Sequence, residues 1–163
     1  DLMQLCGAIK NQYDDCMPLE RPQEILVDVI GLGSGVVDRL REMDLPVRGI
    51  NVAESPSSKK NYLNLRAELW FAIKDWLSKR DCRLPVDDEL AAELVSPSYK
   101  YTSSGKIKLE SKEEMKKRGI KSPDRADSLA LTMASNAVYS SGSDDFLGYN
   151  FRKPVKSKIQ RVG

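Results

Sequence analysis

Residues 24–35, Glu-Ile-Leu-Val-Asp-Val-Ile-Gly-Leu-Gly-Ser-Gly, decide the fold that this sequence predicts. The apolar run around Asp28 is typical of a buried strand, and the glycines that follow it indicate a tight turn into a helix. We expect a strand over 25–30, a helix over about 36–43 and a second strand over 47–52. Such a βαβ unit implies parallel strands joined by a right-handed crossover.

Asp28 interrupts the predicted strand with a carboxylate, and its burial needs an explanation. Removing a carboxylate from water is costly unless the group is hydrogen-bonded, paired with a cation or bound to a metal. One interpretation is therefore a metal ligand. The other is a structural carboxylate that accepts backbone N–H bonds from the glycine-rich turn. Asp28 taken alone does not decide between them.

Two further acids begin a predicted helix over 124–139. Asp124 and Asp127 lie in the segment Ser-Pro-Asp-Arg-Ala-Asp-Ser-Leu of residues 122–129, three positions apart and thus on one helix face. Each has an ordinary alternative, since Asp124 suits the helix dipole and Asp127 has Arg125 or a lysine as a potential ion-pair partner. Together with Asp28, they offer the oxygen ligands that a hard cation prefers, which indicates a metal-dependent nuclease.

Composition narrows the chemistry further. The chain has 163 residues, 40% of them hydrophobic and 31% charged, which is typical of one globular domain. It contains no histidine and three scattered cysteines, so His-based catalysis and an ordinary zinc site are excluded. The first residues do not form a signal peptide. We expect the interior of a longer intracellular chain.

The glycine-rich turn after Asp28 does not bind a nucleotide in this interpretation. A dinucleotide-binding fingerprint requires a third glycine where the chain has Val36. No Gly-Lys-Ser/Thr follows the turn either, so a phosphate-binding loop of the ATPase type is excluded.

The remaining elements follow from helical and strand periodicity. We expect a helix over 1–13, a helix over 62–79 capped by Asn61, a short helix over 87–95 and a hairpin of strands 99–102 and 106–109. Trp70 and Trp76 are interpreted as core residues of the second helix. A basic helix over 112–118 ends at Gly119.

This basic segment supplies the candidate DNA contacts. The candidates are Lys112, Lys116, Lys117, Arg118 and Lys121. Cationic side chains beside the acids favour contacts with phosphates that do not depend on base sequence. The alternative is a solvated helix whose lysines pair with Glu113 and Glu114.

Three blocks of the sequence resemble a known family. They are residues 28–40 (DVIGLGSGVVDRL), residues 109–119 (LESKEEMKKRG) and residues 122–130 (SPDRADSLA). In this order they resemble the C-terminal nuclease domain of the large terminase subunit of tailed bacteriophages, over roughly residues 1–139. The second and third blocks together are fairly specific, whereas the first alone is not.

The resemblance implies an RNase H-like α/β fold, in which helices flank a mixed central sheet and an acidic cluster binds two Mg²⁺ or Mn²⁺ ions. Residues 1–139 would form the nuclease domain, with its opening strands and first acid expected upstream of this chain. Residues 140–163 would form a Gly/Ser break and a basic tail. Asp28 matches the second acid. Asp124 is favoured as the third, with Asp127 as a further ligand or as the actual one.

The implied activity is endonucleolytic cutting of concatemeric double-stranded DNA by two-metal hydrolysis. The implied partners are the small terminase subunit, the portal and the procapsid, without a membrane, in the packaging motor in the host cytoplasm. Two alternatives stay open. One is another RNase H-like nuclease, a resolvase or transposase core, and the other is a non-catalytic DNA-binding module of a packaging motor.

Overall fold

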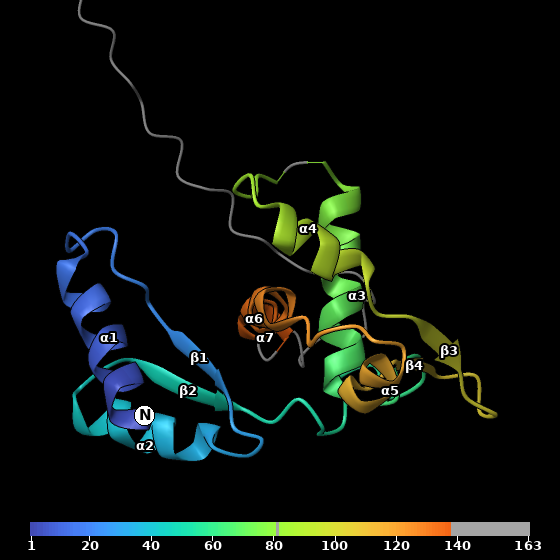
Figure 1. The fold of residues 1–163 in the computed structure, drawn as a ribbon, viewed down its shortest axis with the longest axis horizontal. Coiled ribbons are helices and arrows are strands. Elements are labelled where there is room, and N and C mark those ends of the chain that lie inside the picture. Colours follow the sequence, from blue (N-terminus) through green and yellow to red (C-terminus); the bar gives the residue numbers. More distant parts are fainter. Residues whose placement is uncertain (81, 138–163) are drawn as a thin grey trace, which may run out of the picture.

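The structure, a computed structural model, describes residues 1–80 and 82–137 as an α/β arrangement (Figure 1). The predicted tail over 140–163 lies outside the described residues. The elements are, in chain order, α1 (Leu2–Asp15), β1 (Ile25–Asp28), α2 (Gly33–Glu42), β2 (Val47–Ile50), α3 (Leu65–Ser78), α4 (Asp88–Val95), β3 (Tyr99–Tyr101), β4 (Ile107–Leu109), α5 (Lys112–Lys117), α6 (Asp124–Thr132) and α7 (Ala134–Ala137). No helix among the described residues has both the length and the apolar character needed to cross a membrane.

The βαβ unit forms as the sequence predicts. β1 and β2 are parallel, with Ile25 opposite Val47 and Asp28 opposite Ile50. Both strands are shorter than expected. The helix α2 begins at Gly33 rather than near residue 36, so the last glycines of the turn belong to the helix itself.

The β1–β2 sheet is a wall between two apolar cores. Ile25 and Val27 pack against a cluster formed by α1, α2 and Leu45. Leu26, between them in sequence, packs against a second cluster built mainly on α3 and α6. Side chains alternate between the faces of a strand, and a parallel strand is ordinarily covered on both. Asp28 shares the face of Leu26 and is therefore directed toward α3 and α6.

The helix α3 supplies much of the second core. Its cap is Asn64, whose side chain accepts the N–H of Ala67 at 3.1 Å, so the prediction of Asn61 as the cap was wrong. Asn61 is used elsewhere, because its carbonyl accepts the N–H of Ile107 on β4. Trp70 is buried in this core, as predicted, and Trp76 packs against its edge.

The predicted hairpin is confirmed, because β3 and β4 pair antiparallel with Tyr99 opposite Leu109. The described residues nevertheless form two separate two-stranded sheets, not one mixed central sheet. The other edge of β4 is already paired. Ile107 bonds there with the backbone of Asn61 and Leu63, so β2 does not pair with β4 at this position.

The last predicted helix is divided in two. It begins at Asp124 as expected, but the N–H of Met133 bonds to the carbonyl of Ala130, three residues back, and this tight turn separates α6 from α7. The helix α6 lies beside α3 and α4 in Figure 1. Its first turn is tied to α4, since the Glu93 carboxylate accepts the N–H of Ala126 at 2.9 Å.

The helix α5 is fixed at its start by a capping box. Ser111 accepts the N–H of Glu114, and the Glu114 carboxylate accepts the N–H of Ser111 at 2.8 Å. Gly119, at a φ of 74°, follows the end of the helix, as predicted. The backbone hydrogen bond from Ser111 and the nearby Lys100 lower the pKa of Glu114 from 4.5 to about 2.

We expect Glu114→Gln to be less stable to heat than the parent at pH 7. In acid this difference in stability should become smaller. A carboxyl whose pKa is lowered by folding stabilises the protein above its unfolded pKa, here about 4.5, and this contribution is lost as the pH falls toward 2. Circular dichroism melting curves between pH 2 and pH 7 measure the difference in Tm. It should shrink with acidity, and a difference that stays constant would contradict the assignment. Glu20→Gln, at an exposed position, serves as the control.

Candidate active site

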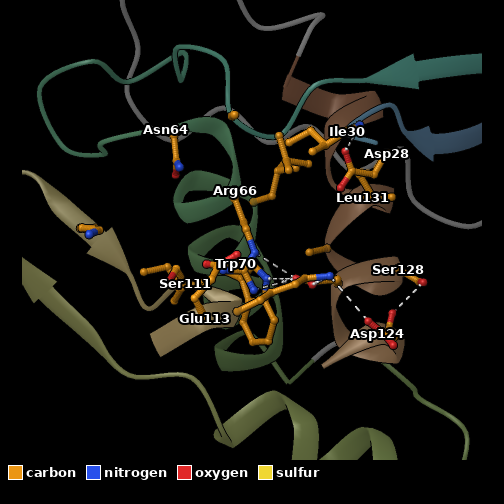
Figure 2. A pocket seen from close by; sticks show the side chains of 18 residues that line it. Asp28, Ile30, Asn64, Arg66, Trp70, Ser111, Glu113, Asp124, Ser128 and Leu131 are labelled. Carbon is orange, nitrogen blue, oxygen red and sulfur yellow. Dashed lines mark hydrogen bonds and ion pairs between the residues drawn. The ribbon is translucent and has the colours of Figure 1, made fainter. Parts of the chain in front are cut away.

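One cavity of about 610 Å³ receives all three acids that the sequence singles out. Asp28 enters it from the end of β1, and Asp124 and Asp127 enter it from the first turn of α6. Arg66 and Trp70 of α3 form the wall opposite, as Figure 2 shows. Residues almost a hundred positions apart in sequence thus meet because α6 packs between α3 and the β1–β2 sheet.

Asp28 has one oxygen engaged in its own turn. Its Oδ1 accepts the backbone N–H of Ile30 at 3.1 Å, which is the structural contact considered from the sequence. In the described part of the chain, no hydrogen-bond donor reaches its other oxygen. The local structure therefore fixes the orientation of this carboxylate while leaving one oxygen available to the cavity.

Asp127 is held by a network of cations and one indole. Its Oδ1 accepts three N–H groups, from Arg66 Nε at 3.2 Å, Arg66 Nη2 at 3.1 Å and Trp70 Nε1 at 2.9 Å. The Lys112 ammonium lies 3.1 Å from its Oδ2. Of the two ion-pair partners considered from the sequence, the lysine is therefore the one observed.

Arg125 pairs with acids of α4 and not with Asp127. Its guanidinium contacts Asp87 at 2.6 Å and Glu89 at 2.7 Å, both at the start of α4. Positions two apart on a helix do not face each other, so Arg125 and Asp127 point to different neighbours. This pairing raises the pKa of Arg125 and ties α6 to α4.

Asp124 is the exposed acid of the group. Its side chain is 78% exposed, against 20% for Asp127. Ser122 Oγ donates to its Oδ1 at 2.6 Å, and the Lys112 ammonium lies 3.6 Å from the same oxygen. Lys112 thus stands between the two acids of α6 and balances part of their charge.

The acids of the cavity offer the type of ligand atom that a divalent cation prefers. The acids of the cavity are carboxylates, and hard cations such as Mg²⁺ prefer oxygen ligands. Among the described residues, the buried Asp127 Oδ2 has no hydrogen-bond partner, and its one ion pair is with the Lys112 ammonium at 3.1 Å, in the place where a metal cation would bind. The carboxylates are not gathered around one point, however. Over residues 1–80 and 82–137, no group of three or more His, Cys, Asp or Glu side chains is placed to hold a metal ion.

The five predicted DNA contacts divide into two groups. Lys112 faces the acids, and Arg118 is committed to Glu110 at 2.6 Å and to the carbonyl of Ser96 at 2.9 Å. Lys116, Lys117 and Lys121 are exposed and form no ion pair with any described residue. Lys116 and Lys121 line a shallow hollow that shares Lys112 and Glu113 with the acid-lined cavity.

The sequence reasoning missed Arg66 and Trp70 as site residues. They are four positions apart on α3 and so lie on one face, and the guanidinium carbon is 5.8 Å from the centre of the indole ring. A signal was present, because Arg66 lies one helical turn from Trp70, which the sequence assigns to the core, and a cation on a core-facing stripe needs an acidic partner. Nothing in the sequence indicates which acid it finds.

Comparisons with known proteins place the fold. No protein-family model matches the chain, and no curated protein matches it significantly. Solved structures do, and those that match include nuclease domains of a phage large terminase subunit. The nuclease domain of the large terminase subunit gp2 of bacterial virus Sf6 is similar, with 25% sequence identity and a TM-score of 0.59 over 69% of this chain.

Two structures of one and the same mutant of gp2 give a similar result. One, solved with manganese and β-thujaplicinol, has 24% identity and a TM-score of 0.59, and another, solved with calcium, has the same two values. The chain spans 65% of the length of each of these structures. The resemblance to a terminase nuclease domain that the sequence indicates is thus confirmed.

Proposed function

We propose that this chain is a metal-dependent endonuclease domain of a phage DNA-packaging terminase, which cuts concatemeric double-stranded DNA. One observation carries the proposal. Asp28, Asp124 and Asp127, which were selected from the sequence, line the same cavity in a chain with the fold of a terminase nuclease domain. Acids that served only local structure would have no reason to converge from β1 and α6.

Asp28, Asp124 and Asp127 would hold two Mg²⁺ or Mn²⁺ ions, and the manganese and calcium in the similar structures support a divalent cation. When bound, such ions lower the pKa of water and stabilise charge on a phosphodiester during hydrolysis. Asp28 offers its free oxygen from a fixed strand end, and Asp127 offers its buried Oδ2. Asp124, which is exposed, has room to adjust its position.

The basic residues beside the cavity would hold the DNA backbone. Lys116 and Lys121 face the hollow that adjoins the acids, and no described carboxylate neutralises them. Lys112 supplies positive charge between the acids and, by position, lies where the hollow meets the cavity. Phosphate contacts of this kind orient a duplex without reading its sequence.

The wider setting is part of the same proposal. We infer an RNase H-like fold, with the small terminase subunit, the portal and the procapsid as partners and the host cytoplasm as the location. The small sheet and the flanking helices are compatible with this fold. Its support is the similarity to the gp2 nuclease domain.

Cleavage of supercoiled plasmid DNA by the 163-residue chain tests the proposal. We expect nicked and linear products with Mg²⁺ or Mn²⁺ and none with EDTA. Binding of DNA without cleavage under any metal condition, both by this chain and by a longer chain that includes the first acid implied by the family resemblance, would contradict the nuclease and favour a non-catalytic DNA-binding module. A strong preference for four-way junctions over linear duplex would instead favour a resolvase core.

The double change Lys116→Ala with Lys121→Ala is expected to weaken DNA binding and flatten its dependence on salt. Each phosphate neutralised by a lysine contributes about 0.9 to the slope of log K against log salt, so the slope should fall by about two. Fluorescence anisotropy with a labelled duplex at several salt concentrations measures it. Arg41→Ala, an exposed cation on α2, is the control. An unchanged slope in the double variant would show that Lys116 and Lys121 do not contact the DNA phosphates.

A further inference from the structure

The structure assigns Arg66 as a positioning residue which, with Trp70, makes Asp127 a ligand that offers a single oxygen to a divalent cation. This inference rests on the proposed metal-dependent nuclease and adds to it a residue that holds one acid in place. It concerns the orientation of the carboxylate, because neither Arg66 nor Trp70 is itself a metal ligand.

The two carboxylate oxygens of Asp127 have different contacts. A carboxylate oxygen has about two lone-pair positions, and Oδ1 already receives three N–H groups from Arg66 and Trp70. No position on Oδ1 is left for a cation. Within the described residues, Oδ2 is buried, has no hydrogen-bond partner and pairs only with the Lys112 ammonium at 3.1 Å. Asp127 therefore turns one defined oxygen toward the positive charge in the cavity.

Arg66 is itself held in place by its own contacts. Its Nη1 donates to the carbonyl of Glu110 at 2.8 Å, and its side chain is only 14% exposed. The guanidinium also lies over Trp70, which belongs to the core. These contacts leave Arg66 little freedom, so the orientation that it gives to Asp127 is fixed.

The contrast with Asp124 supports this division of roles. No arginine among the described residues pairs with Asp124, and its side chain is largely exposed. One acid of α6 is thus held rigidly and the other is adjustable. Ligands oriented by an outer layer of hydrogen bonds are a general feature of metal sites, and loss of such a partner typically lowers metal affinity by about 10–100-fold.

A simpler role for Arg66 is to join α3 to α6. In that case its replacement would lower stability and leave the metal affinity of the folded protein unchanged. Arg66→Lys separates the two roles, because lysine keeps the charge but cannot direct two N–H groups at Oδ1 while also donating to Glu110.

The experiment is calorimetric titration of the chain with Mn²⁺ alone, below the melting temperature of each variant. We expect Arg66→Lys to lower the affinity for Mn²⁺ by about 10–100-fold. In plasmid cleavage, the Mn²⁺ concentration for half-maximal rate should rise by a similar factor, with most of the rate recovered at saturating Mn²⁺. An unchanged affinity in folded Arg66→Lys would overturn the inference.

Arg48→Lys is the matched control. Arg48 forms a similar two-pronged ion pair with Glu24, with Nη2 at 3.1 Å from Oε2, but neither residue lines the cavity. Its replacement should leave Mn²⁺ affinity unchanged. If Arg66→Lys does not fold, Trp70→Phe removes one donor to Oδ1 while keeping an aromatic ring in the core, and it should weaken Mn²⁺ binding in the same direction.

The outcomes also separate this inference from the proposed function. If the parent chain binds Mn²⁺ and Arg66→Lys and Trp70→Phe bind it equally well, the positioning role is wrong and the nuclease stands. If neither the parent chain nor a longer chain that includes the first acid binds Mn²⁺ or cleaves DNA, the proposed function fails and the positioning role fails with it.

Discussion

Asp28→Asn is expected to reduce metal-dependent DNA cleavage by more than about 100-fold, since even the loss of a residue that only orients a metal ligand costs about 10–100-fold. Asparagine has nearly the same shape, and its amide oxygen still accepts the N–H of Ile30. The substitution removes the negative charge and leaves the turn in place. The rate of plasmid nicking under Mn²⁺ measures the effect, and thermal unfolding shows that the fold is retained.

The control for this prediction is Asp38→Asn. Asp38 is an exposed acid on α2 whose nearest cation, Arg41, is 3.6 Å away, and it does not line the cavity. Its replacement should leave the cleavage rate unchanged. If Asp28→Asn cleaves DNA at the parent rate but melts at a lower temperature, Asp28 is the structural carboxylate considered from the sequence. The nuclease would then have to depend on other residues.

Gly33→Ala is expected to destabilise the chain by about 1–3 kcal/mol or more, the range for added atoms that fit no space. A Cβ at Gly33 would lie 1.7 Å from the carbonyl oxygen of Asp28 and 2.8 Å from its carbonyl carbon. Both are backbone atoms, so the end of β1 or the start of α2 must move. The urea midpoint measures the loss, and cleavage by the protein that remains folded should fall because Asp28 is displaced.

Gly35→Ala, two residues further along the same helix, is the matched control. Its Cβ would meet only the side chain of Leu2, at an ordinary contact distance of 3.8 Å. Alanine is favoured over glycine inside a helix by about 0.5–1 kcal/mol, so this variant should be as stable as the parent or more stable. Equal losses in the two variants would show that the close approach at Gly33 is not the cause.

Close packing of α2 against the end of β1 explains why the turn is rich in glycine. The sequence predicts no phosphate-binding role for this turn. Gly33 instead allows α2 to begin directly against Asp28, and Gly31, at a φ of 75°, reverses the chain after Ile30. The strand end and its carboxylate are thereby fixed in front of α6.

Much of the fold could be predicted from the sequence because its signals are local. The apolar run at Asp28 followed by glycines predicts a strand and a helix. Ser111 with Glu114 predicts the start of α5, and Gly119 its end. The similarity to terminase nuclease domains could be recognised from three short sequence blocks and their order along the chain. The helix cap at Asn61 was wrong because a neighbouring asparagine serves equally well in sequence, and pairing with β4 decides between the two.

The choice of partners among the charged residues was decided only by the tertiary structure. Asp127 has an arginine two positions away in sequence, yet it binds Arg66, 61 positions away, because α3 packs against α6. Arg118, a candidate for DNA binding, is instead held by Glu110. The sequence by itself determined which residue types were available and where the elements form. Which carboxylate meets which cation depends on how those elements pack, since an ion pair needs only proximity in space and nothing in the local pattern records it.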